Sequence, residues 1–184
     1  MTYPFRGTIF TPVKYLTIAA ALIVAAPLPA RAADPACAIT RTTPEFRVEI
    51  AVAMTRGDES ESERLSQTLS DAVQACADAA GYDDQQGAAY FDFVLSEISR
   101  GWLIGELGKV GLSHVVIDKA LDFGAGRTNS TLEEDISEAQ IGAIISGYVA
   151  GGVEIEKVPQ QAWELVGAYA AATGIYWQAA GKLP

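Results

Sequence analysis

The sequence predicts an all-α fold, a single-domain bundle of about five to six helices that follows an export signal. Apolar residues recur every three or four positions through most of the chain, which is the period of a helix buried along one face. Glycines stand where most of these segments end. No repeat or linker divides them, and the 184-residue chain without its first 32 residues has 152, which is the size of one domain.

Residues 1–32 have the features of a cleaved secretory signal peptide. Arg6 and Lys14 precede an apolar run over residues 15–26, two prolines end this run, and Ala30 and Ala32 place small residues at the cleavage-site positions. The run is shorter than the roughly 20 residues that a membrane-spanning helix needs, which favours cleavage over an uncleaved anchor. We therefore expect a mature domain of residues 33–184 that is periplasmic or secreted and has no transmembrane span.

The first helix of the mature chain is predicted to begin after Thr43, which can cap it, and to end at Gly57. One alternative stays open here, because apolar and other residues alternate over residues 46–54 with the period of a half-buried strand. A Val-Glu-Ile triplet occurs in this segment and again at residues 153–155. The alternative is a small two-stranded β patch that joins the two triplets.

Two longer helices are predicted next, over residues 60–80 and 86–107. Ser60 and Glu63 have the spacing of a capping box, and Gly81 is placed to end the first of them. The second carries an apolar stripe that is wide enough to pack on more than one side. Its residues are Phe91, Leu95, Ile98 and Trp102.

The last part of the mature chain is expected to form three more helices. A short one covers residues 113–123, and a glycine-rich loop follows over residues 124–130. Thr131 and Glu134 have the spacing of a second capping box, which predicts a helix from there to residue 150. Gly151 and Gly152 end that helix, and the final one begins near Pro159 and runs to about residue 180.

Cys37 and Cys76 are the two cysteines of the chain, and both follow the leader. An oxidising compartment favours a disulfide between them. Such a bridge would close a loop of about 40 residues, which stabilises the fold by about 4 kcal/mol in the chain-entropy model. We expect a structural bridge, because the spacing is not that of a redox Cys-x-x-Cys pair. Whether the bridge lies within one chain or joins two chains stays open.

The charge balance excludes several classes of partner. The leader holds three of the 13 basic residues and no acid, so the mature chain keeps 10 against 23 acidic residues, a formal charge of −13. Nucleic acid is not expected as a partner, because phosphate binding needs clustered Lys and Arg. The same charge disfavours anionic lipid surfaces and favours a basic protein or a cationic ligand.

Motifs for catalysis, metals and cofactors are missing from the sequence. His114 is the single histidine, and its neighbour Ser113 cannot use it as a base, because adjacent helical residues do not face each other. Acidic residues cluster at 58–63 and at 133–135, where they fit the first turns of predicted helices, and neither cluster has the pattern of a calcium loop. We expect no metal and no cofactor.

Two stretches, residues 141–153 and 165–181, are almost free of charge and rich in alanine, glycine and aromatic residues. They fit the central helices of the bundle, or an exposed apolar face that a partner covers. The aromatic candidates for such a partner or ligand surface are Trp102, Trp163, Tyr169, Tyr176 and Trp177.

The leading hypothesis is an exported, acidic, non-enzymatic helical protein that acts by binding another protein in the cell envelope. It predicts an exposed apolar patch rimmed by acids. One alternative is a cell-envelope hydrolase or lyase that uses two of the carboxylates Asp92, Glu97 and Glu106. Another is a carrier of an apolar small ligand, with its cavity between the helix at 86–107 and the last helix.

Overall fold

A computed structural model describes residues 34–124, 126–127 and 136–184. This part of the chain is an all-α, single-domain bundle, as the sequence predicts. It has seven α-helices where about five to six were expected, because the four-residue α1 was not predicted. The α-helices are α1 (Ala36–Ile39), α2 (Pro44–Arg56), α3 (Glu59–Ala80), α4 (Asp84–Lys109), α5 (His114–Leu121), α6 (Glu138–Ala150) and α7 (Gln160–Ala180), and a 3₁₀ turn, η1 (Ile155–Lys157), precedes α7. The expected signal peptide lies outside the described residues.

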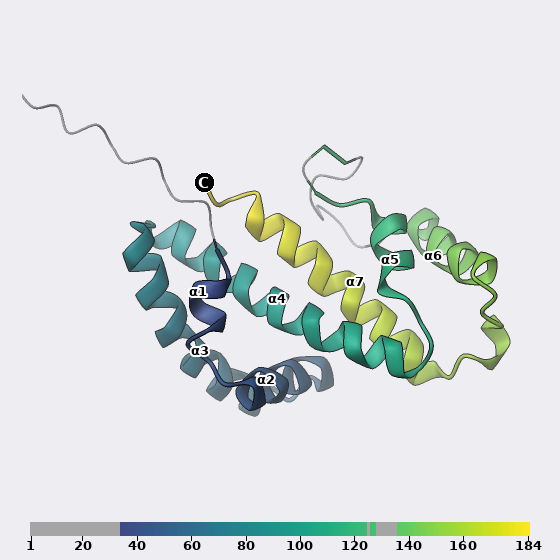
Figure 1. Ribbon diagram of the computed structural model, residues 1–184, viewed down its shortest axis with the longest axis horizontal. Helices are drawn as coiled ribbons and strands as arrows, with labels where there is room; N and C mark the ends of the chain where they lie inside the picture. The colour runs from purple at the N-terminus through teal and green to yellow at the C-terminus, as the bar shows by residue number, and fades with distance from the viewer. Residues whose placement is uncertain (1–33, 125, 128–135) are drawn as a thin grey trace, which may run out of the picture.

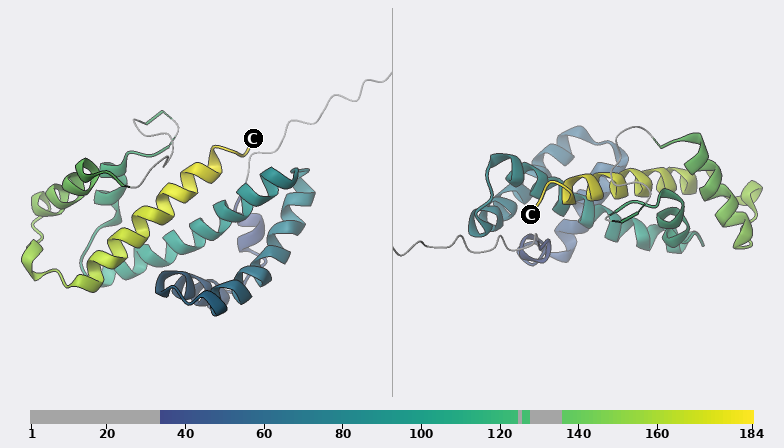
Figure 2. Two further views of the ribbon diagram at one scale, coloured as in Figure 1. Left: turned by 180° about the vertical axis from the view of Figure 1, so that it is seen from behind. Right: turned by 90° about the horizontal axis from the view of Figure 1, so that it is seen from above.

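Two long antiparallel helices, α4 and α7, form the centre of the bundle and lie side by side along most of their length (Figure 1). Helices α1, α2 and α3 gather around the first half of α4, and α5 and α6 lie beyond its second half (Figures 1 and 2). The buried residues accordingly form two clusters. One lies among α1, α2, α3, the first half of α4 and the end of α7, and the other among the second half of α4, α5, α6 and the rest of α7.

Most predicted helix ends are confirmed. The Thr43 hydroxyl accepts the Phe46 N–H at 3.2 Å, and Gly57 ends α2 with a positive φ of 68°. Helix α3 ends at Gly81 as expected, with φ 75°. Only glycine adopts this left-handed conformation without steric cost, which is why these positions stop the helices.

The alternative of a small β patch is wrong, because neither Val-Glu-Ile triplet forms a strand. Helix α2 includes the first triplet, and η1 begins at the end of the second. Val48 is 49% exposed and Met54 is 44% exposed, whereas Ile50 is fully buried. The alternating apolar residues therefore lie on different sides of a helix, and the two-residue period does not describe one buried face.

Two predicted helix starts are also corrected. Asp58, rather than Ser60, caps α3, since its carboxylate accepts the Glu61 N–H at 3.2 Å. Helix α6 begins at Glu138, where Ser137 and Gln140 form a capping box. The expected box of Thr131 and Glu134 lies outside the described residues. Asp58 and Ser137 each have a side-chain oxygen that reaches an N–H of the first turn, which is what a cap requires.

The disulfide between Cys37 and Cys76 is present and lies within one chain. It ties α1, which has only four residues, to the buried face of α3. The Tyr90 hydroxyl adds a second link to this region by donating to the Asp34 carbonyl at 2.7 Å. No helix in the described ranges is both long and apolar enough to cross a membrane.

Candidate functional site

The aromatic residues that the sequence offered as a partner surface lie mainly in the protein interior. Tyr169 is fully buried, so its assignment to a surface is corrected. Tyr176 stacks on Phe93 with ring centroids 4.7 Å apart, and Trp163 packs edge-to-face against Tyr148 at 6.1 Å. The half-buried members of the set are Trp102, Trp163, Tyr176 and Trp177. Their main contribution is to core packing.

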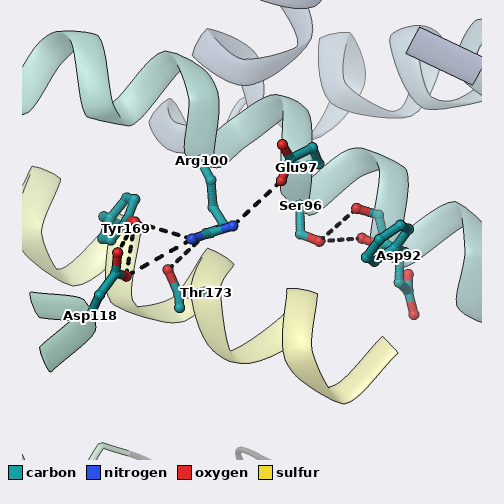
Figure 3. Close-up of polar contacts among 8 residues, drawn as sticks. Asp92, Ser96, Glu97, Arg100, Asp118, Tyr169 and Thr173 are labelled. Atoms are coloured by element: carbon teal, nitrogen blue, oxygen red, sulfur yellow. Dashed lines mark hydrogen bonds and ion pairs between the residues drawn. The ribbon is translucent and has the colours of Figure 1, made fainter. Parts of the chain in front are cut away.

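The three carboxylates of the hydrolase alternative all lie on α4 but do not converge. Asp92 and Glu106 are 14 residues apart, which is about 21 Å along a helix. Glu97 is turned about 140° around the axis from Asp92, and the two side chains point away from each other (Figure 3). A pair that cleaves a glycosidic bond needs a separation of about 5–10 Å across a shared cleft. The structure therefore offers no such pair among these residues.

Asp92 is exposed as a residue, but its carboxyl lies partly against neighbouring protein atoms. Burial raises the pKa of its carboxyl above the ordinary value, and the positive charge of Lys182 opposes this shift. Glu97 contacts Arg100 at 3.4 Å, and Glu106 contacts Lys109. These two contacts are the i, i+3 ion pairs expected on a helix surface.

The remaining residues considered for catalysis or metal binding have structural roles. His114 begins α5, and its ring lies 5.8 Å from that of Tyr169 in an edge-to-face contact. In the acidic cluster at 58–63, Asp58 caps α3 and Glu61 pairs with Arg64 at 2.6 Å. The second cluster, at 133–135, lies outside the described residues. No group of three or more His, Cys, Asp or Glu side chains that could hold a metal ion occurs within the described ranges.

Helix α6 presents an apolar surface to solvent. Ile141, Ile145 and Val149 recur every four residues, so they form one stripe, and they are 47%, 38% and 55% exposed. Only Ile144 and Tyr148 of this helix are buried. No charged residue occurs over residues 141–153. We call the stripe of Ile141, Ile145 and Val149 the α6 face.

The arrangement of α6 explains this exposure. It is the outermost helix at its end of the molecule and packs mainly on α5 (Figures 1 and 2). Gly147 lets the two helices approach closely, since a Cβ there would lie 2.7 Å from Val116 Cγ1. The Tyr148 hydroxyl donates to the Ser113 carbonyl at 3.1 Å and fixes the contact. A helix that is apolar all round is normally buried all round, whereas α6 is covered on one side only.

Acidic residues stand at both ends of the apolar segment. Glu138 begins α6, and Glu154 and Glu156 follow its other end, all three being exposed. Lys157 pairs with Glu154 at 2.7 Å. Glu138 and Glu156 make no ion pair with any residue that the structure describes, so they are the charges beside the α6 face that no described cation neutralises.

A second feature lies where α4, α5 and α7 meet, centred on Arg100 (Figure 3). The Arg100 side chain is only 17% exposed. Its Nε donates to the Thr173 hydroxyl at 3.1 Å, and its Nη2 donates to the Tyr169 hydroxyl at 3.2 Å. Its guanidinium also lies over the Tyr176 ring, 4.7 Å from the centroid. Contacts from three sides hold the guanidinium in one orientation.

Tyr169 extends this network to α5. Its hydroxyl donates to the Asp118 carboxylate, with oxygen distances of 2.9 and 3.1 Å. Asp118 in turn lies 3.9 Å from Arg100 Nη2. Burial is the main cause that raises the pKa of the Tyr169 phenol, and the Arg100 charge opposes it. The hydroxyl therefore stays protonated and acts as both donor and acceptor between the two charged groups.

The Arg100 network forms one wall of a cleft of about 630 Å³. We call it the Arg100 cleft. It is lined by Arg100, Val115, Asp118, Lys119, Asp122, Phe123, Gly124, Arg127, Thr173 and Trp177. A Cβ on Gly124 would lie 3.1 Å from the Trp177 ring, so the chain after α5 runs directly against the indole.

Among the partners of Arg100, Glu97 alone lies on the same helix, at the i, i+3 spacing that is visible along the chain. The other partners of Arg100 come from α5 and α7, and Tyr169 is 69 residues away. Spacing within one helix carries no signal for such a contact.

Comparison with known proteins finds no matching family model, no matching curated protein and no matching solved structure.

Proposed function

We propose that this chain is an exported, acidic, non-enzymatic helical protein that acts by binding another protein, and that α6 is the element it inserts into the partner. The observation that carries the proposal is the exposed stripe of Ile141, Ile145 and Val149 on an uncharged helix. The sequence features of a leader and the Cys37–Cys76 bridge support a periplasmic or secreted location.

The spacing of the α6 face favours one mode of recognition. Apolar anchors at i, i+4 and i+8 are what a helix presents when it lies in an apolar groove of a partner. Burying each of these three side chains against a partner would stabilise the complex by on the order of 1 kcal/mol. The exposed face therefore favours association.

The charges beside the α6 face indicate the chemistry of the partner. Glu138 and Glu156 flank the apolar segment, and the mature chain carries a formal charge of −13. A second acidic protein would be repelled. We therefore infer a partner with an apolar groove and basic residues near its ends, where the acids of this chain would lie.

The test compares two exposed valines. Val149 is 55% exposed on the α6 face, and Val48 is 49% exposed on α2, away from α6. Val149→Glu and Val48→Glu make the same chemical change at similar exposure. Each chain carries an affinity tag and is purified after export. It is then used to capture proteins from the cell-envelope extract of the native organism. Light scattering measures the molar mass of each purified chain in solution.

We expect the wild type and Val48→Glu to retain one partner in equimolar amount, and Val149→Glu to lose it. The purified partner should then bind the wild type directly, with at least tenfold weaker binding to Val149→Glu. Three results would overturn the proposal: no partner retained by the wild type, equal retention by both variants, or a wild-type dimer that Val149→Glu converts to a monomer. Flotation of the wild type with lipid vesicles that Val149→Glu abolishes would instead assign the face to a membrane.

A further inference from the structure

We infer that the Arg100 cleft is a binding site for a small organic monoanion with a flat apolar body, such as an aromatic carboxylate. This inference concerns a different surface from the α6 face and does not depend on it. It also differs from the apolar-ligand cavity expected between α4 and α7, because the walls of this cleft are charged.

The cleft gathers positive charge in an acidic chain. Three of the 13 Lys and Arg residues line it, namely Arg100, Lys119 and Arg127, and ten lining residues drawn at random would include fewer than one. Asp118 and Asp122 are the lining acids. Arg100 lies 3.9 Å from Asp118 and Arg127 lies 3.4 Å from Asp122, so Lys119 is the excess positive charge of the lining. Glu97 contacts Arg100 without lining the cleft. A singly charged anion matches this balance.

Hydrogen-bond donors remain for such an anion. Arg100 has five N–H groups, and three of them donate to Glu97, Tyr169 and Thr173. The other two, one on each Nη atom, make no hydrogen bond within the described residues, although Asp118 lies 3.9 Å from Nη2. Lys119 is exposed and makes no ion pair with any described residue. A fixed arginine beside an exposed lysine suits a carboxylate, which arginine binds through two oxygens.

Two aromatic residues also belong to the lining. Trp177 and Phe123 both border the cleft, and Gly124 keeps the chain close to the indole without covering it with a side chain. A flat ring can stack on such a surface while its carboxylate faces the cations. The volume of about 630 Å³ falls in the range of about 300–1,000 Å³ that holds small organic molecules.

The probe is 2-naphthoate, and its neutral isostere 2-naphthamide tests whether charge is recognised. Both are titrated into the full chain, purified after export, by calorimetry at low salt. Lys119→Glu removes a cleft cation, and Lys157→Glu makes the same change on η1, outside the cleft. Circular dichroism confirms that each variant is folded.

We expect 2-naphthoate to bind at sub-millimolar concentration and 2-naphthamide to bind at least about tenfold more weakly. Lys119→Glu should weaken naphthoate binding about tenfold, because it replaces an attraction by a repulsion at close range. Lys157→Glu should leave binding within about twofold, because the interaction of a distant, solvent-exposed charge is weak in water. Equal binding of the two probes, equal effects of the two variants, or no naphthoate binding at 10 mM would overturn the inference.

Discussion

The Tyr169 hydroxyl donates to the Asp118 carboxylate at 2.9 Å, which joins the centre of α7 to the exposed side of α5. The same oxygen accepts an N–H of Arg100 from α4. One buried phenol therefore holds three helices at a fixed distance. Because these contacts also orient the guanidinium in the Arg100 cleft, packing and the proposed anion site depend on the same atom.

Tyr169→Phe should lower the free energy of unfolding by about 1–3 kcal/mol. The change leaves Asp118 without its phenol donor and Arg100 without one acceptor, and hydrogen bonds to charged groups contribute this much. Urea denaturation followed by circular dichroism measures the loss. Tyr176→Phe is the control, because the Tyr176 hydroxyl has no hydrogen bond within the described part of the chain, while its ring stays under Arg100. Equal losses in the two variants would mean that the hydrogen bonds of Tyr169 contribute nothing specific.

Local signals explain why the sequence predicted the helices. The cap at Thr43 and the stop at Gly81 each depend on contacts within a few residues, so their chemistry is visible along the chain. The disulfide was predictable for another reason, because only two cysteines exist. Asp58 and Ser137 show the limit of this approach. Several polar residues compete as caps in each segment, and only the folded backbone selects one.

The candidate sites were less predictable from the sequence, because the exposure of a side chain depends on which helices pack against each other. The segment at 141–153 and the last helix have similar apolar compositions, yet α7 lies at the centre of the bundle and α6 lies at its edge. Periodicity identifies an apolar face but does not tell which helix covers it. The Arg100 cleft unites residues from three helices, and the separation of 51 positions between Asp118 and Tyr169 gives no pattern to detect.

Removing the disulfide should lower the free energy of unfolding by about 2–4 kcal/mol. Cys37 and Cys76 are 39 residues apart, and the entropy model relates this loop length to a stabilisation of that size. The double variant Cys37→Ala/Cys76→Ala and the wild type are compared in urea with and without dithiothreitol. The reductant should destabilise the wild type and leave the double variant unchanged. An unchanged wild type under reducing conditions that break the bond would contradict the prediction.

Replacing either of two glycines of α6 by alanine should change the stability of the protein, and the two changes should be opposite in sign. Gly142→Ala should raise the free energy of unfolding by up to about 1 kcal/mol, because no atom lies within 4 Å of the new methyl group and alanine favours helix. Gly147→Ala should lower it, because the methyl group would lie 2.7 Å from Val116 Cγ1 and push α6 away from α5. Thermal unfolding of both variants measures the difference. A gain in stability for Gly147→Ala would show that the two helices do not need this close contact.

Tyr148 should make the protein less stable in alkali. Its side chain is 1% exposed, and burial raises the pKa of its phenol from 10.0 to about 12. The unfolded chain loses this proton near pH 10, whereas the folded chain keeps it up to about pH 12, so folding is penalised as the pH rises between these values. Tyr148→Phe cannot ionise and escapes this penalty.

The comparison of Tyr148→Phe with the wild type isolates this effect, because the other tyrosines titrate in both proteins. At pH 8 the variant should be less stable by about 1 kcal/mol, since it lacks the hydrogen bond to the Ser113 carbonyl. At pH 11 the difference should shrink or reverse, because only the wild type has a phenol at this position that the unfolded state can ionise. Urea denaturation at the two pH values measures both differences. A difference that stays constant from pH 8 to pH 11 would mean that Tyr148 ionises equally in the folded and unfolded chains, and that the α5–α6 contact does not bury its hydroxyl in solution.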